Sequence, residues 1–351
     1  MASANSGLQI TNLDFGSIKS SLKSFLQQQD TLKDYNFEGS ALSTLLDLLA
    51  YNTQYNAYYL NMVANENFLD SAVLRNSVVS HAKKLGYTPR SAAASRATIN
   101  VSVNSGSANT GSLTIPKGYI FLSNNIDGVS YNFVTLSDTT VSKTGNNFVF
   151  SNLNVYEGQL VNYVYNYDEL SNPKQIFTLP DSNIDTSTLK VIINPSTSNT
   201  DIIVYTKAES ALTVDSNSEV YYLQEGLNEQ YQIYFGDNIV GKKLPNGAVV
   251  NLEYLVTNGS AANGANSFVS STTISGYSNI TVASVNKASG GSQKETVDQI
   301  KYAAPLSFLA QNRAVTKNDY IKLIQQKYPA FESVNVWGGE EQDPPVYGKV
   351  F

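Results

Sequence analysis

The chain has 351 residues, a net charge of −6, a single histidine and no cysteine. Nucleic-acid binding depends on clustered Lys and Arg, and this acidic chain has no visible cluster of that kind. The lack of cysteine excludes disulfide bonds, a thiolate nucleophile and a cysteine-ligated metal. No apolar run approaches the length of about 20 residues that crosses a bilayer. We therefore expect a protein made in a reducing cytoplasm that binds neither nucleic acid nor membrane.

Charged residues make up only 15% of the chain, against roughly 25% in an average soluble protein. Asn, Ser, Thr and Tyr take their place, so the surface pays little desolvation when it binds a partner. The 23 tyrosines either serve interfaces or simply populate β-strands, and the sequence leaves both readings open. A chain of this length exceeds what one hydrophobic core usually serves, so we expect several sub-domains.

Residues 1–92 carry apolar side chains at helical spacing in three stretches, 18–26, 42–63 and 74–85. Gly86 is expected to end the third helix. These stripes form either a self-contained helical core or a bundle surface for the helices of a partner. The interface candidates are Leu42, Leu45, Leu46, Leu49, Tyr55 and Tyr59.

Between Ser95 and Val285 the spacing of apolar residues changes to two, as residues 97–103 illustrate, and turn clusters separate the runs. This pattern predicts an all-β middle. Loop residues around 172–181 divide it, so we expect two β-rich domains, 93–175 and 176–289.

The last segment, residues 290–351, begins with the pair Gly290-Gly291, which is typical of a hinge. Ser292 precedes Glu295 by three residues, and Thr316 precedes Asp319 by the same distance. Both pairs fit a capping box, in which a hydroxyl and a carboxylate bond each other's backbone amides at a helix start. Two linked helices are therefore expected after the hinge.

Pro305 is expected to end or kink the first of these helices, and Tyr328-Pro329 to stop the second. Arg313 and Asp319 flank the second start, and we expect them to fix the angle between the helices. Residues 333–337 and 346–351 read as strands around an acidic loop. The fold class is thus α+β and multidomain, with an N-terminal helical segment, a large all-β middle and a C-terminal helix pair followed by strands. Because the chain stops inside its last expected strand, we expect it to be the N-terminal part of a longer protein.

The C-terminal pattern resembles the Baseplate-J-like family of contractile-tail phages and related injection machines, and residues 337–351 are similar to the baseplate wedge proteins of T-even-like phages. The likeness is strong from Tyr231 to the end and looser in the N-terminal third. It is carried by segments 234–237, 244–247 and 257–264 and by Gly290, Gly291, Glu295, Pro305, Arg313, Thr316, Asp319 and Tyr320.

This resemblance implies a structural subunit of the virion tail baseplate, assembled in the host cytoplasm, with no catalytic, cofactor-binding or metal-binding residues. Its partners would be a second copy of itself, a larger wedge subunit, and other wedge and sheath-initiating baseplate proteins. Joined wedges would form a ring around the central hub that rearranges to trigger sheath contraction. A different reading, a β-rich tail protein that binds or cleaves glycans, stays open because spacing cannot show two carboxyl groups facing across a cleft.

Residues 236–243 have the Gly, four residues, Gly-Lys spacing of a phosphate-binding loop. The residue after Lys242 is Lys243, where that motif needs a hydroxyl, and a strand rather than a helix follows. We therefore predict a β-hairpin here and no nucleotide site.

His81 lies on the third expected helix without a nucleophile-elbow pattern, and is interpreted as a structural histidine. Glu340, Glu341 and Asp343 match no calcium-loop spacing and are expected to form a solvated turn.

Overall fold

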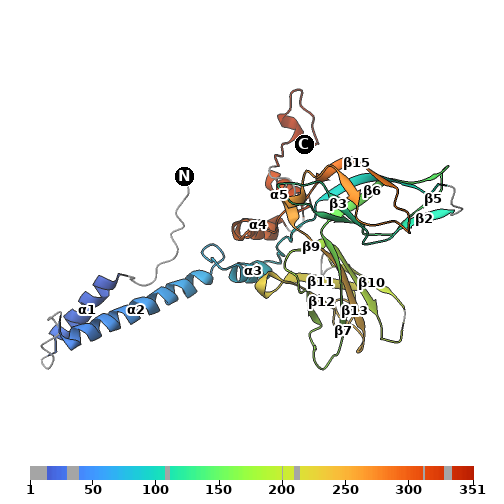
Figure 1. The fold of residues 1–351 in the computed structure, drawn as a ribbon. Coiled ribbons are helices and arrows are strands. Elements are labelled where there is room, and N and C mark those ends of the chain that lie inside the picture. The colour runs from blue at the N-terminus through green and yellow to red at the C-terminus, as the bar shows by residue number, and fades with distance from the viewer. Residues whose placement is uncertain are drawn as a thin grey trace. The chain divides into compact units, whose positions relative to one another are not determined.

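The computed structural model describes residues 14–29, 39–106, 111–199, 201–208, 214–310, 313–327 and 334–351. The chain divides into two compact units, Met1–Lys84 and Leu85–Phe351. The first unit is helical, and the second contains both β-sheets and the C-terminal helices (Figure 1). This arrangement confirms the α+β, multidomain class. None of the helices in the described ranges is both long enough and apolar enough to span a membrane.

The first unit contains α1 (Phe15–Gln27), α2 (Ala41–Glu66) and α3 (Arg75–Lys84), as the helical spacing predicts. Asp14 and Ser40 cap α1 and α2, because the side chain of each accepts a hydrogen bond from the backbone amide three residues on. In Figure 1, α1 lies alongside α2.

A six-stranded sheet in the second unit has the order β14-β3-β4-β6-β1-β15, and β2 and β5 form a separate antiparallel two-stranded sheet. The central strand β1 is antiparallel to both β6 and β15 and alternates between buried and exposed residues, as its period of two predicts. The strands concerned are β1 (Arg96–Asn104), β2 (Ser112–Ile115), β3 (Ile120–Ser123), β4 (Asn132–Val134), β5 (Thr139–Ser142), β6 (Asn147–Glu157), β14 (Phe268–Ser270) and β15 (Ile280–Ser289).

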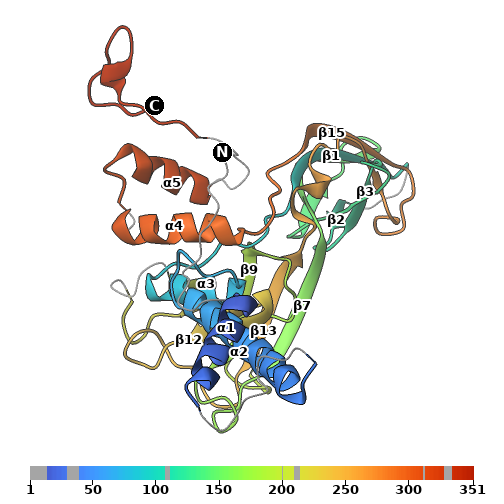
Figure 2. The ribbon, with the colours of Figure 1, turned by 90° about the vertical axis from the view of Figure 1, so that its left-hand side faces the viewer.

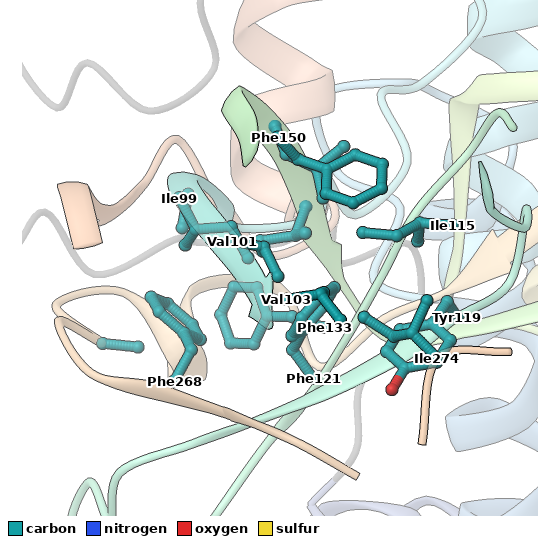
Figure 3. Packing of buried hydrophobic residues seen from close by; sticks show 14 of the residues in the cluster. Ile99, Val101, Val103, Ile115, Tyr119, Phe121, Phe133, Phe150, Phe268 and Ile274 are labelled. Carbon is teal, nitrogen blue, oxygen red and sulfur yellow. The ribbon is translucent and has the colours of Figure 1, made fainter. Parts of the chain in front are cut away.

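Aromatic and β-branched side chains fill the core of this sheet (Figure 3). Ile99, Val101 and Val103 of β1 are all fully buried. The rings of Phe133 and Phe268 meet edge to face with centroids 4.9 Å apart. Each such side chain stabilises the fold by about 1.5–3 kcal/mol through removal of its apolar surface from water.

A seven-stranded sheet has the order β7-β13-β9-β10-β11-β12-β8, with antiparallel pairs except between β10 and β11. A second core lies on this sheet, and Tyr167, Tyr254 and Ile233 are among its most buried side chains. The strands are β7 (Gln159–Asn166), β8 (Ile176–Thr178), β9 (Ile184–Asn194), β10 (Ile203–Lys207), β11 (Val220–Glu225), β12 (Tyr231–Phe235) and β13 (Val249–Val256).

The two sheets divide the chain differently from the expected ranges 93–175 and 176–289. The seven-stranded sheet already begins at β7, and β14 and β15 return to the six-stranded sheet. The hairpin predicted around residues 236–243 is also wrong, because β12 pairs with β11 and β8 while β13 pairs with β7 and β9. A period of two identifies strands but carries no information about which strands pair.

The C-terminal part contains α4 (Val297–Ala310), α5 (Lys317–Lys327) and the 3-10 turn η5 (Gly339–Glu341). Figure 2 shows α4 and α5 side by side. Pro305 was expected to end or kink the first helix, and it does not end it, because α4 continues to Ala310. Buried Ala304 and Ala310 hold the helix on both sides of the proline, so packing compensates for the hydrogen bond that proline cannot donate.

The expected stop at Tyr328-Pro329 lies outside the described residues. Beyond it, the two extended segments expected at the end of the chain pair with each other. The backbones of Trp337 and Phe351 exchange hydrogen bonds of 3.0 Å in both directions.

Two tyrosines of the second core give the fold a predictable alkaline limit. Burial raises the pKa of Tyr221 to about 12. Burial and the Glu219 carboxylate together raise the pKa of Tyr205 to about 12. A free tyrosine titrates near pH 10, so above about pH 10 the unfolded chain releases protons that the folded chain keeps. The stabilisation that these two protonated tyrosines contribute is therefore fully present below about pH 10 and is lost as the pH rises through about 12.

We expect the urea midpoint of the second unit to be level from about pH 8 to 9.5 and to fall by pH 11. Tyr221→Phe should make this alkaline fall shallower, because one titrating group is removed. Equal slopes for the variant and the parent chain would contradict the assignment.

Candidate assembly interface

One face of α2 carries large apolar side chains that are exposed. With Asn52 counted, most of their positions follow the three- and four-residue spacing of a coiled-coil seam, and Leu49 and Val63 lie beside that seam. Each is between 40% and 62% exposed, although side chains of this kind are usually buried. We call this set the α2 stripe, and it consists of Leu45, Leu48, Leu49, Tyr55, Tyr59, Met62 and Val63.

The opposite face of α2 is used within the first unit. The buried residues of the helix, which include Leu46, Ala50 and Ala57, lie on that face. An ion pair of 2.5 Å between Lys19 of α1 and Asp47 joins the two helices. Because α1 packs on this side, the α2 stripe is not required for the internal packing of the two helices.

Aromatic contacts order the middle of the stripe. The ring of Tyr55 lies 5.6 Å from that of Tyr51 and 5.2 Å from that of Tyr59. Asn56 donates a 2.9 Å hydrogen bond from its Nδ2 to the side-chain oxygen of Asn52. Rings that already contact one another in tilted and edge-to-face arrangements lose little rotamer freedom on binding, which favours association.

The structure places four of the six predicted interface residues, Leu45, Leu49, Tyr55 and Tyr59, on the exposed stripe. Leu42 is half-buried, and Leu46 is only 4% exposed, so its side chain is not available to a partner. The prediction missed Leu48, Met62 and Val63. Counting heptad positions from Leu45 would have found Leu48 and Met62, which fall on the seam, and Val63 lies directly beside it.

The buried Glu295 carboxylate links two segments of the second unit that are distant in sequence, and we call this link the clasp. Its carboxylate accepts hydrogen bonds from the Tyr87 hydroxyl at 2.7 and 2.8 Å and from the Arg90 amide at 2.9 Å. The side chain is only 6% exposed. Burial and this carboxylate raise the pKa of Tyr87, so the phenol stays protonated and donates.

Residues 87–95, which contain both Tyr87 and Arg90, also bond to the strands of the second unit. Asp185 of β9 accepts a 2.8 Å hydrogen bond from the Ala94 amide, and the Tyr231 hydroxyl of β12 donates to the Pro89 carbonyl at 3.0 Å. Ala93 pairs with Ser292 in an antiparallel bridge. Residues 87–95 are therefore held by hydrogen bonds to distant parts of the second unit, although most of them have no regular secondary structure.

A second buried carboxylate, Glu157, stands where the chain leaves β6 for the other sheet. It accepts hydrogen bonds from the Thr257 hydroxyl at 2.6 Å and from the Asn258 amide at 3.0 Å. Glu157 and Asp185 were not predicted, since nothing in the local sequence distinguishes them from surface acids.

The two hinge glycines have different reasons to be glycine. Gly290 has a φ of +85°, a conformation that other residues rarely adopt. Gly291 lacks the space for a side chain, because a Cβ there would lie 2.2 Å from the Ser95 hydroxyl and 2.4 Å from the Gly259 carbonyl.

We expect Gly291→Ala to lower the free energy of unfolding of the second unit by about 1–3 kcal/mol, the usual cost of overpacking. Urea denaturation would measure the loss. Gly111→Ala is a matched control, because neither glycine has a φ in the left-handed region and Gly111 has nothing within 4 Å of its added Cβ. Equal costs at both sites would show that lack of space at Gly291 is not the cause.

The first predicted capping box is wrong and the second is confirmed. The Glu295 carboxylate accepts from the Tyr87 hydroxyl rather than from a backbone amide of Ser292. The start of α4 is capped instead by Thr296, which exchanges hydrogen bonds with Gln299. At α5, the Asp319 amide donates to the Thr316 hydroxyl at 3.3 Å, and the Thr316 amide donates to the Asp319 carboxylate at 2.8 Å.

Asp319 is thus used by the cap of α5, where Tyr320 occupies the first turn. That Arg313 fixes the angle between α4 and α5 stays a prediction. Arg313→Ala should lower the thermal midpoint of the second unit by a few degrees, and calorimetry would test it. An unchanged midpoint with unchanged assembly would contradict the role.

The phosphate-loop spacing at residues 236–243 forms a tight turn without a nucleotide site. A Cβ on Gly236 would lie 2.1 Å from the backbone of Gly241. Lys242 pairs with Glu219 at 2.7 Å and Lys243 pairs with Glu169 at 2.6 Å. Strand β13 follows, as predicted, so no helix N-terminus is aimed at a phosphate.

His81 lies on α3 as expected, with its Nε2 3.0 Å from the Glu66 carbonyl. Across the described ranges, no group of three or more His, Asp and Glu side chains could hold a metal ion. Glu340 and Glu341 form the short turn η5.

Three family models match segments of the chain in order. Residues 14–87 match the helical domain of gp6-like baseplate wedge proteins, residues 160–258 match the third domain of bacteriophage baseplate wedge protein gp6, and residues 316–351 match C-terminal domain I of baseplate structural protein gp6. The chain therefore contains three segments similar to domains of gp6-like baseplate wedge proteins. The broader Baseplate-J-like assignment stays an expectation.

The curated baseplate wedge protein gp6 of Enterobacteria phage T4 is 31% identical over 341 residues. The match covers 90% of this chain and 50% of that protein, so the chain spans about half the length of this relative. The match to the gp6 third domain begins and ends close to the limits of the seven-stranded sheet from β7 to β13.

Among solved structures, the chain is similar to a component of the anti-feeding prophage baseplate, determined by cryo-electron microscopy with six-fold symmetrisation. That match has 15% identity and a TM-score of 0.34, and covers 93% of this chain and 59% of the other. A TM-score this low does not establish a shared overall fold.

Proposed function

We propose that the chain is a structural, non-enzymatic subunit of a contractile-tail baseplate wedge, located in the virion tail after assembly in the host cytoplasm. It pairs with a second copy of itself and binds a larger wedge subunit, together with other wedge and sheath-initiating baseplate proteins. Joined wedges form the ring around the central hub, and rearrangement of that ring triggers sheath contraction.

The α2 stripe carries this proposal. The seven large apolar side chains exposed along this stripe are costly in a protein that stays alone in water. The spacing favours a helical partner over a flat one, because a coiled-coil seam buries its residues only against another helix. The matches to gp6 wedge domains supply the biological setting in which such partners exist.

Light scattering on the purified chain, and on the chain co-expressed with the larger wedge subunit from the same phage, would test the proposal. We expect a defined complex that holds two copies of this chain for each larger subunit. Monomers in both samples would reject the pairing and leave the gp6-like domains as a sign of ancestry alone.

A further inference from the structure

Asn52 interrupts the α2 stripe near its middle. Leu45, Asn52 and Tyr59 follow one another at intervals of seven residues and occupy the same seam position. Asn52 is exposed, as are the stripe residues one turn before and after it. A partner that covers the stripe therefore also covers this amide.

The Asn52 amide then favours a hydrogen-bonding group, rather than an apolar side chain, on the partner helix that faces it. Its oxygen already accepts from Asn56 at 2.9 Å, so the amide is oriented by its own helix and its Nδ2 is left to donate outward. Covering it with a purely apolar helix would leave that donor unpaired, which costs free energy. A second copy in the same register supplies the matching amide, because Asn52 then faces Asn52.

Neither of the two charged side chains of α2 lies within the stripe. Asp47 is paired with Lys19 on the α1 side, away from the stripe. The Glu66 carboxylate accepts from the Val73 amide at 2.9 Å, beyond the end of the stripe. The helix contains no other acidic or basic residue. Interhelical ion pairs, which often set the direction of coiled coils, are therefore not available within the seam.

We propose that Asn52 is the residue that fixes two α2 helices as parallel and in register. This inference rests on the proposed pairing through the α2 stripe. In the antiparallel arrangement that overlaps the same stripe, Asn52 faces the ring of Tyr55 and its donor loses the matching amide. A shift of one heptad places it against Leu45 or Tyr59, with the same loss.

Because the chain contains no cysteine, single cysteines report the direction directly. We would introduce Leu48→Cys and Met62→Cys, near the two ends of the stripe, and oxidise each full-length variant alone and as a mixture. In a parallel, in-register pair each variant cross-links to its own copy, and the 48–62 cross-link is absent. In the antiparallel pair that sets Asn52 opposite Tyr55, residue 48 lies opposite residue 59, so the two residues 48 are roughly 16 Å apart along the helices. Residues 48 and 62 then lie within one helical turn of each other, so only the mixture cross-links.

The role of Asn52 is tested by Asn52→Leu in the chain that carries both cysteines. We expect 48–62 cross-links, identified by mass spectrometry, to rise at least fivefold, while association becomes tighter because the seam is then entirely apolar. Asn76→Leu is the matched control. It changes the same residue type at an exposed position of α3, away from the stripe and from the Asn52–Asn56 hydrogen bond, and should leave the cross-link pattern as in the parent.

A parent chain that pairs but yields mainly 48–62 cross-links would overturn the parallel register, and an Asn52→Leu variant with an unaltered pattern would overturn the role of Asn52. Both outcomes leave the proposed pairing intact. A parent chain that stays monomeric in light scattering rejects the pairing itself, and this inference with it.

Discussion

Leu45→Asp combined with Leu49→Asp is expected to abolish self-association while leaving the first unit folded. Both side chains are more than half exposed in the single chain, so the substitutions remove little internal packing. Burial of each leucine against a partner contributes about 1.5–3 kcal/mol, so the loss corresponds to at least about a 100-fold weaker complex. Light scattering and circular dichroism on the same sample would measure the two effects.

The control adds the same charge elsewhere in the first unit. Asn76→Asp with Ser80→Asp places two aspartates at the same spacing on exposed positions of α3. This variant should associate like the parent chain. If it dissociates equally, added charge rather than the α2 stripe explains the result. If the leucine variant keeps both its fold and its partner, the stripe is not the interface.

Glu295→Ala is expected to lower the free energy of unfolding of the second unit by about 3–5 kcal/mol. The substitution leaves the Tyr87 hydroxyl and the Arg90 amide without the carboxylate that both now bond, at a site where Tyr87 and Glu295 are both buried. A buried donor that loses its acceptor costs about 1–3 kcal/mol. Urea denaturation followed by tyrosine fluorescence would measure the change.

Two further variants separate charge from size. Glu295→Gln keeps the volume and one acceptor oxygen, so a smaller loss than for alanine is expected. Asp298→Ala removes an exposed carboxylate from the first turn of α4 and should cost at most about 1 kcal/mol. A loss from Glu295→Ala no larger than that from Asp298→Ala would show that the clasp contributes little.

Local patterns in the sequence predicted local structure well. The spacing of Thr316 and Asp319 was sufficient to place the start of α5, because both groups of that cap lie within four residues. The same pattern failed at Ser292 and Glu295, where Tyr87 is 208 residues away from the carboxylate it bonds. A sequence motif describes what a residue can do nearby, and it carries no information about a distant competitor.

The candidate interface shows the same limit from another side. Helical spacing predicted that Leu45, Leu46 and Leu49 all lie on an apolar face of α2. It could not tell that Leu46 faces inward while the other two face solvent, because α2 has apolar residues around most of its circumference. That distinction depends on where α1 packs.

The order of strands has a consequence for how the protein folds during synthesis. β1 ends at Asn104, and its partner β15 begins only at Ile280. Every strand of the seven-stranded sheet is made between them, from β7 to β13. That sheet is thus an insertion whose pairings are complete once residue 256 has left the ribosome, whereas one edge of β1 waits without its neighbour. The seven-stranded sheet should therefore form first. Completion of the six-stranded sheet should be the slow step, because the strands β1 and β15 that pair in it are farther apart in sequence.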